Sequence, residues 1–198
     1  CFPNNWIVAE GKGLGDPDSC ERSIANYKAA YTSLLPFFQN NPNTLYVAFT
    51  APPIAKPNDL KEYVKRLLGR SSGNASEIGS RARAFNNWID DIEGGWLAGY
   101  PLKNVVVFDY YDILTGSGKS NWSVYPTGNG KDSHPSNEGN AKAASEFMPF
   151  LNKALNKLAG SRSSSGREHL AHSLVLSASR NKNSLQGNGK YSDTWSLR

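Results

Sequence analysis

The chain has 198 residues, 38 % of them hydrophobic, and this size favours one core-bearing domain over two. Of its net charge of +5, +4 lies in residues 161–198, which hold six Lys/Arg and two Asp/Glu. The body therefore offers no basic groove, and we expect no nucleic-acid partner. There is no run of eighteen apolar residues, so we expect no membrane partner either.

The first half of the chain predicts a helix, a strand and a second helix. Apolar side chains recur at three- and four-residue spacing over Ala25–Phe38, with Pro36 bending or ending this helix. A buried strand follows over Thr44–Thr50, because the segment is rich in β-forming residues and stops at two prolines. The second helix is predicted across residues 75–93, where Glu77 can pair with Arg81.

The second half adds a strand and a long helix. The strand Asn104–Asp109 is apolar at consecutive positions, as in a parallel sheet covered on both faces. The last helix begins after Ser136 as N-cap, runs to about Leu158 and contains Pro149 as a kink. This alternation predicts an α/β fold, a three-layer α/β/α sandwich with a parallel sheet. Two strands are too few for such a sheet, so we expect the fold to be N-terminally incomplete.

We expect two regions in the chain. Residues 1–159 form the α/β domain. Residues 160–198 contain ten serines with scattered basic residues and asparagines, which predicts a poorly ordered tail.

A polar loop at Lys131–Gly139 holds the most specific candidate for chemistry. It places His134 just before the last helix, with Asp132 close enough in sequence to orient an imidazole. A base with an orienting carboxylate is what serine ester hydrolysis requires. The alternative is that His134 is a surface histidine in a capping loop.

Two segments resemble those of the SGNH (GDSL-type) hydrolases. Asp132-Ser-His-Pro135, followed by Gly139 and a helix, is similar to the last segment of that family, whose histidine is the general base. Thr50-Ala-Pro-Pro53 resembles its Thr-x-Pro-Pro segment. The resemblance covers residues 1–158 and implies the three-layer fold, with His134 as base.

The same resemblance assigns further roles. It makes Asn4 or Asn5 the donor to the oxyanion, the alternative being an ordinary loop asparagine. The family spaces its acid and histidine as Asp-x-x-His, whereas one residue separates Asp132 from His134 here and Lys131 stands at the usual acid position. Asp132 is therefore the candidate acid with a changed spacing.

The family's nucleophile lies in a Gly-Asp-Ser-like segment at the end of its first strand. We expect this segment to lie upstream of Cys1, so we expect the chain as given to be inactive. Ser173, in Ala171-His-Ser-Leu174, is an alternative nucleophile in a circularly permuted order. The resemblance also implies a secreted or periplasmic protein.

Aromatic residues flank the histidine loop. They are Tyr110, Tyr111, Trp122 and Tyr125. We expect their rings to receive a sugar or an acyl group; the alternative is that they merely cover an edge of the core. The spacing of the nearby aspartates matches no metal-ligand pattern, so we expect no metal and no cofactor.

The leading hypothesis is therefore an SGNH-type serine ester hydrolase acting on O-acyl esters of small molecules or carbohydrates, as a monomer. The alternatives are a non-catalytic carbohydrate-binding or interaction module on the same fold, and a truncated gene product.

Overall fold

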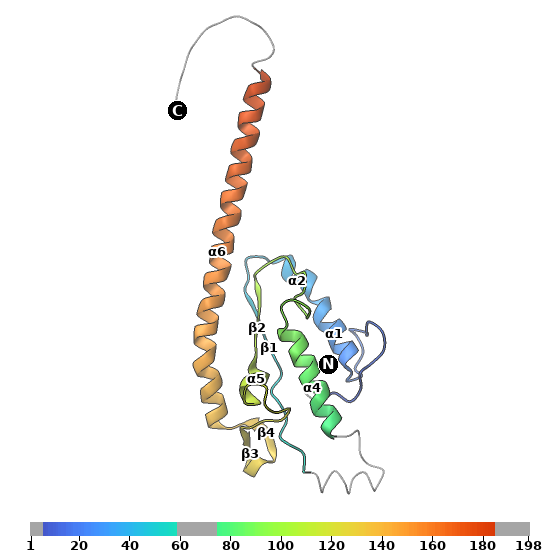
Figure 1. Cartoon of the computed structure of the whole chain (residues 1–198). Helices are drawn as coiled ribbons and strands as arrows, with labels where there is room; N and C mark the ends of the chain where they lie inside the picture. The colour runs from blue at the N-terminus through green and yellow to red at the C-terminus, as the bar shows by residue number, and fades with distance from the viewer. Residues whose placement is uncertain (1–5, 59–74, 185–198) are drawn as a thin grey trace, which may run out of the picture. The chain divides into compact units, whose positions relative to one another are not determined.

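The computed structural model of the chain describes residues 6–58 and 75–184, and for residues 161–184 it describes the backbone alone. It is a mixed α/β structure with two compact units, Cys1–Leu155 and Asn156–Arg198. Figure 1 shows the elements, which in chain order are α1 (Ile24–Ser33), α2 (Leu35–Gln39), β1 (Tyr46–Phe49), α4 (Ala75–Asp90), β2 (Val105–Phe108), α5 (Tyr110–Leu114), β3 (Pro126–Thr127), a 3-10 turn (Gly128–Gly130), β4 (Asp132–Pro135) and α6 (Asn137–Ser184).

The central sheet consists of β1 and β2, which pair in parallel with Tyr46 opposite Val105. Both strands lie where the sequence predicts them, and the prediction of a parallel sheet is confirmed for this pair. The N–H of Thr50 continues the pairing by donating to the Phe108 carbonyl at 3.2 Å. Successive residues of a strand direct their backbone N–H and C=O groups to opposite sides. Because those of Thr50 face β2, the N–H and C=O of Val47 point away from β2. In the described part of the chain, neither outer edge of this sheet pairs with another strand.

The two faces of the β1–β2 sheet contribute to different apolar clusters. On one face, Val105 packs in a buried cluster with Tyr27 of α1 and Phe85 of α4. On the other face, Phe108 belongs to a second cluster that includes Phe147 of α6, with the two ring centroids 5.1 Å apart. The consecutive apolar residues of β2 are thus explained, because alternate side chains enter opposite clusters.

The first two predicted helices are confirmed, each with a local change. Pro36 interrupts the first one, and α1 and α2 meet at Leu34, with the proline in the first turn of α2, where its missing N–H leaves no bond unmade. The second one, α4, ends at Asp90 and not at residue 93. Its last predicted turn is replaced because the Asp91 carboxylate accepts the N–H of Glu93 at 3.0 Å, a local bond that competes with the helix.

The last predicted helix starts as expected and ends later. The Oγ of Ser136 accepts the N–H of Gly139 at 3.3 Å, which confirms the N-cap. The helix then passes Pro149 and Gly160 and ends at Ser184, beyond the predicted end near Leu158. No proline follows Pro149 in the sequence, and Gly160 and Gly166 each cost the helix only about 1 kcal/mol, so serine-rich composition alone does not end it. No helix among the described residues is long and apolar enough to cross a membrane.

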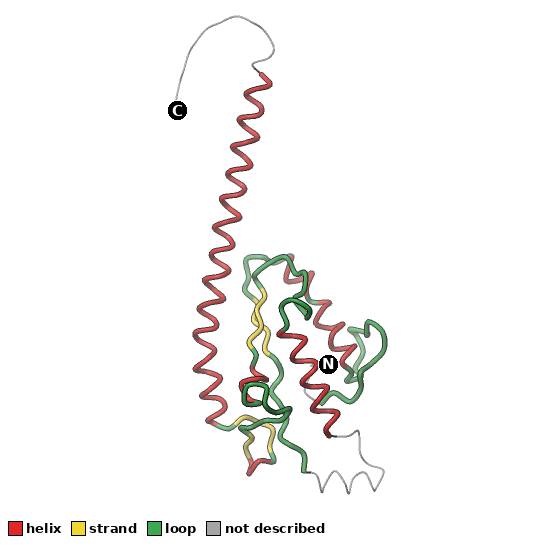
Figure 2. Tube along the Cα trace, viewed as in Figure 1, coloured by secondary structure: helices red, strands yellow, loops and turns green. Residues whose placement is uncertain are grey.

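Two elements were not predicted. One is the short helix α5, which Asp109 caps by accepting the N–H of Asp112 at 3.0 Å. The other is the antiparallel pairing of β3 with β4, which leads directly into α6 (Figure 2). The two strands of this hairpin have two and four residues and each contains a proline, so they show no alternation of apolar and polar residues.

Candidate active site

Asp132 and His134 lie on the strand β4. Side chains two residues apart in a strand point to the same face, so the changed spacing still brings the carboxylate to the imidazole. The Asp132 Oδ1 atom lies 2.6 Å from the His134 Nδ1 atom. The same oxygen accepts the backbone N–H of His134 at 3.0 Å.

Hydrogen bonds from His134 hold the pKa of the Asp132 carboxyl below its usual value, first the backbone N–H and then the side chain. An ionised carboxylate keeps the imidazole proton on Nδ1 and leaves the lone pair on Nε2. The His134 side chain is 87 % exposed, and among the described residues no hydrogen bond reaches Nε2. This nitrogen is therefore free to accept a proton from a hydroxyl placed beside it.

A hydrogen bond joins the histidine loop to Ala55, which lies just after the Thr50–Pro53 segment and far from the loop in sequence. The N–H of Ala55 donates to the Ser133 Oγ at 3.0 Å. On the other side of the loop, the Thr127 hydroxyl donates to the His134 carbonyl at 3.1 Å. The two segments that resemble the SGNH family are thus neighbours in space.

Thr50 occupies the end of β1 and is fully buried. Its hydroxyl donates to the Asp109 Oδ1 at 2.9 Å and accepts the N–H of Tyr111 at 2.7 Å. Both hydrogen-bonding roles of the hydroxyl are therefore used to fix the start of α5 against the strand end. This threonine holds the loops in place and takes no part in the candidate chemistry.

Gly139 explains how closely the first turn of α6 approaches the neighbouring loop. A Cβ atom at this position would lie 2.7 Å from the Tyr125 Cβ and 3.1 Å from the Leu114 Cδ2. Only glycine leaves room for this contact, which sets the position of the helix that follows His134.

The four predicted aromatic residues have different surroundings. Tyr111 is fully buried, its hydroxyl donates to the Asn121 carbonyl at 3.1 Å, and burial raises the pKa of its phenol to about 12, so it is part of the core and not of an open surface. Trp122 packs close to Gly79 of α4, and Tyr125 packs on the first turn of α6. Tyr110 lines a cavity beside α6. Of the four, Tyr110 alone lines a cavity that the structure describes.

Three further candidates lie outside the described residues. Asn4 and Asn5, the candidate oxyanion donors, precede the described part of the chain. Ser173 falls in the unit Asn156–Arg198, on the part of α6 whose side chains lie outside the description. The roles assigned to these residues stay predictions.

A second cavity, of about 410 Å³, is lined by the last residues of β2 and by several carboxylates. Burial raises the pKa of Asp90 and Asp109, and for Asp90 the charges of Asp109 and Asp112 raise it further. Arg83 of α4 forms an ion pair with Asp112. Among the described residues, no group of three or more His, Cys, Asp or Glu side chains is arranged to hold a metal ion.

The sequence did not predict two residues that position the loops around the site, Arg83 and Asn140. Arg83 reaches from α4 to the loop after α5, where it donates to the Thr115 hydroxyl at 2.8 Å and lies over the Tyr111 ring. Asn140 lies on α6, accepts from the Tyr110 hydroxyl at 3.2 Å and donates to the Pro135 carbonyl at 3.3 Å. Neither belongs to a motif, and their partners lie on other elements, so local sequence carries no signal for them.

Comparison of the chain with protein-family models, with curated proteins and with solved structures finds no match in any of the three.

Proposed function

We propose that the chain carries the acid/base part of an ester-hydrolase site of the SGNH type, within a three-layer α/β/α fold. The observation that carries the proposal is the Asp132–His134 contact of 2.6 Å, with Nε2 of His134 exposed and unoccupied by any described residue. The hydrogen bond from Ala55, just after the Thr50–Pro53 segment, to Ser133 of the histidine loop supports it. The separate clusters on the two faces of the sheet support the three-layer arrangement.

In this proposal the reaction is acyl transfer from an O-acyl ester to water through a serine. The Nε2 of His134 takes the serine proton as the oxygen attacks the ester carbonyl, and then gives that proton to the departing alcohol. A water molecule, activated by the same nitrogen, releases the acid and restores the serine. Asp132 keeps the imidazole in the tautomer that each step needs, and Asn4 or Asn5 donates to the oxyanion.

The serine of this mechanism comes from a segment that the described residues do not contain. No hydroxyl of the described side chains hydrogen-bonds to Nε2 of His134. We therefore propose that the described part of the chain hydrolyses an activated ester only slowly, through the exposed imidazole.

The test is the hydrolysis of p-nitrophenyl acetate by the purified chain, next to His134→Ala, Asp132→Asn and Ser173→Ala. We expect a slow rate above buffer that is lost in His134→Ala, lowered several-fold in Asp132→Asn and unchanged in Ser173→Ala. His172→Ala is the matched control, because it removes a histidine of the second unit.

Two results would contradict the proposal. A rate that does not depend on His134 would remove the acid/base role and favour a non-catalytic binding module. Loss of the rate in Ser173→Ala would identify the nucleophile as Ser173 and contradict the proposed hydrolysis through the imidazole.

A further inference from the structure

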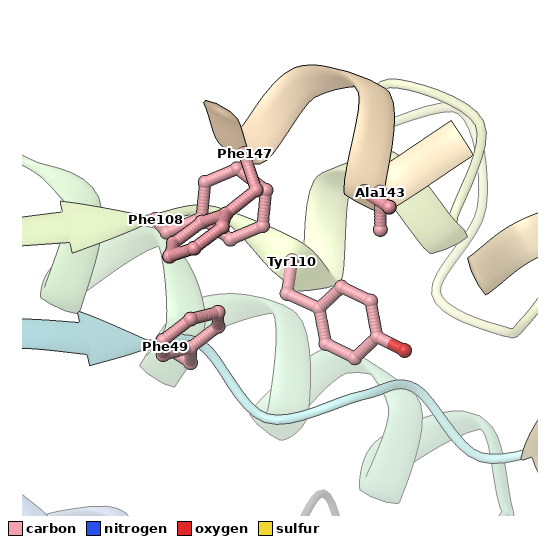
Figure 3. A pocket seen from close by; sticks show the side chains of 6 residues that line it. Phe49, Phe108, Tyr110, Ala143 and Phe147 are labelled. Carbon is pink, nitrogen blue, oxygen red and sulfur yellow. The ribbon is translucent and has the colours of Figure 1, made fainter. Parts of the chain in front are cut away.

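A cavity of about 230 Å³ lies at the carboxyl ends of β1 and β2, against α6. Figure 3 shows its side chains, which come from both strands, from α5 and from α6; the lining residues are Phe49, Phe108, Tyr110, Ala143, Ala144 and Phe147. Three of them are phenylalanines in mutual contact, with centroid separations of 5.1 to 5.4 Å. These rings form a continuous apolar wall.

Two features make this space available to an apolar occupant. The α6 side contributes alanines, whose methyl groups leave the space that a larger side chain would fill. The Phe49 side chain at the end of β1 remains 48 % exposed. Covering an exposed aromatic ring with an apolar group is favourable by about 25 cal/mol for each Å² removed from water. The cavity therefore favours an apolar occupant.

The polar end of the cavity is a single hydroxyl. In Figure 3 the oxygen of Tyr110 points away from the phenylalanine rings, and it donates to the Asn140 Oδ1 at 3.2 Å. Asn140 in turn donates to the carbonyl of Pro135, the residue after His134. Burial raises the pKa of Tyr110, so its hydroxyl is a neutral donor. The polar rim of the cavity is thus linked to the histidine loop by two hydrogen bonds.

None of the six lining residues is charged. An occupant that matches this lining has an apolar body for the phenylalanine wall and its polar atoms beyond that wall, because the one proton of the Tyr110 hydroxyl is already donated to Asn140. A dry cavity of roughly 150 Å³ is large enough for benzene, so this one has room for a short chain or one ring. An acyl group has this distribution of polarity, with its carbonyl at one end, whereas a sugar ring carries hydroxyls on every side.

We propose that this cavity binds the short-chain apolar acyl group of the ester, with its carbonyl end toward Tyr110; this assignment rests on the ester-hydrolase function proposed above. It places substrate selection on the acyl side, in a pocket formed by the sheet and α6. The alcohol side of the ester then extends toward the exposed histidine loop.

The test uses hexanamide, an uncharged analogue that the site cannot hydrolyse, and measures its binding to the full chain by NMR. We expect hexanamide to bind with intermolecular contacts from its terminal methyl to Phe147 and Ala143, and acetamide, which lacks the chain, to bind at least tenfold more weakly. Ala144→Leu fills the cavity and should weaken hexanamide binding at least tenfold. Ala141→Leu adds the same side chain to an exposed position of the same helix that does not line the cavity, and should bind like the wild type.

The proposal is overturned if hexanamide shows no contacts to Phe147, if acetamide binds equally well, or if Ala144→Leu and Ala141→Leu behave alike. The methyl contacts in the wild-type protein decide the question even if Ala144→Leu does not fold. His134→Ala is measured in parallel and should still bind hexanamide, because binding does not use the imidazole. The two proposals are therefore tested separately: the acyl site by hexanamide binding, and the Asp132–His134 pair by ester hydrolysis.

Discussion

The strand end at Thr50 and the loop at His134 differ in how many hydrogen bonds their side chains already make within the protein. The Thr50 hydroxyl is fully buried and both donates and accepts a hydrogen bond within the protein. The His134 side chain is 87 % exposed and uses only its Nδ1 atom. A polar group whose hydrogen bonds are complete stabilises the fold, and one that keeps a free lone pair in solvent is available for chemistry. Stability and reactivity should therefore respond separately to changes in the two segments.

The largest effect is expected at Thr50. The variant Thr50→Val keeps the shape of the side chain and removes both hydrogen bonds, which leaves the half-buried Asp109 carboxylate without one donor and the buried Tyr111 N–H without its acceptor. We expect the free energy of unfolding to fall by about 2–3 kcal/mol, measured by urea denaturation. Thr44→Val, at an exposed threonine, is the control and should stay within about 0.5 kcal/mol of the wild type. Equal stability of the two variants would show that the buried hydroxyl contributes nothing.

An intermediate effect is expected at Gly139, where the helix and the histidine loop meet. In Gly139→Ala the new methyl group would lie 2.7 Å from the Tyr125 Cβ, so the loop or the helix must move. Overpacking of this kind costs about 1–3 kcal/mol, seen as a lower thermal midpoint. Gly160→Ala, where a Cβ meets nothing within 4 Å, should leave the midpoint unchanged or raise it. If Gly139→Ala had a thermal midpoint as high as that of Gly160→Ala, the loop and the helix would accommodate the methyl group without loss of stability.

The smallest effect on stability, and the clearest effect on chemistry, is expected in Asp132→Asn. The Asp132 carboxylate favours the tautomer of His134 with its proton on Nδ1, whereas the amide of an asparagine can donate to that nitrogen, which favours the proton on Nε2. The ¹⁵N shifts of the imidazole report this change of tautomer directly. Thr50→Val should keep the wild-type tautomer, and a wild-type tautomer in Asp132→Asn would show that the carboxylate does not orient the ring.

The same pair also predicts a dependence on pH. Because the pKa of Asp132 is lower in the folded chain, the unfolded chain binds more protons in the acid range. The stabilisation is present above the unfolded pKa of about 3.9 and is lost as the pH falls through the folded value. The difference in stability between wild type and Asp132→Asn should therefore shrink on acidification, and a difference that grows would reverse the assigned direction.

The sequence predicted the elements in which buried residues recur at one regular spacing. Val105–Phe108 has apolar residues at consecutive positions because its side chains enter two clusters, and α4 presents Ile78, Phe85 and Ile89 to the core at helical spacing. The proximity of Asp132 to His134 was also expected from their separation in sequence. Local pattern is sufficient in these cases because the partners are near in the chain or repeat regularly along it.

The elements that were missed depend on contacts between distant residues. The helix α5 is fixed by Asp109 together with the hydroxyl of Thr50, 59 residues away in sequence. Tyr111 was predicted to line a substrate site, and the bond between Thr50 and its N–H holds it in the core instead. The Tyr110–Asn140 contact, which links the cavity to the histidine loop, spans 30 residues. No periodicity encodes such pairs.

Within residues 6–58 and 75–184 the two edges of the β1–β2 sheet pair with no further strand, and this affects how the chain behaves in concentrated solution. Each strand has four residues, so the backbone groups of only two residues on each strand point outward. A strand from another molecule would gain few hydrogen bonds there, and Pro52 and Pro53 prevent β1 from extending beyond Thr50 to offer more. The shortness of the strands is thus a protection against fibre formation, which an edge of ordinary length in the same place would promote.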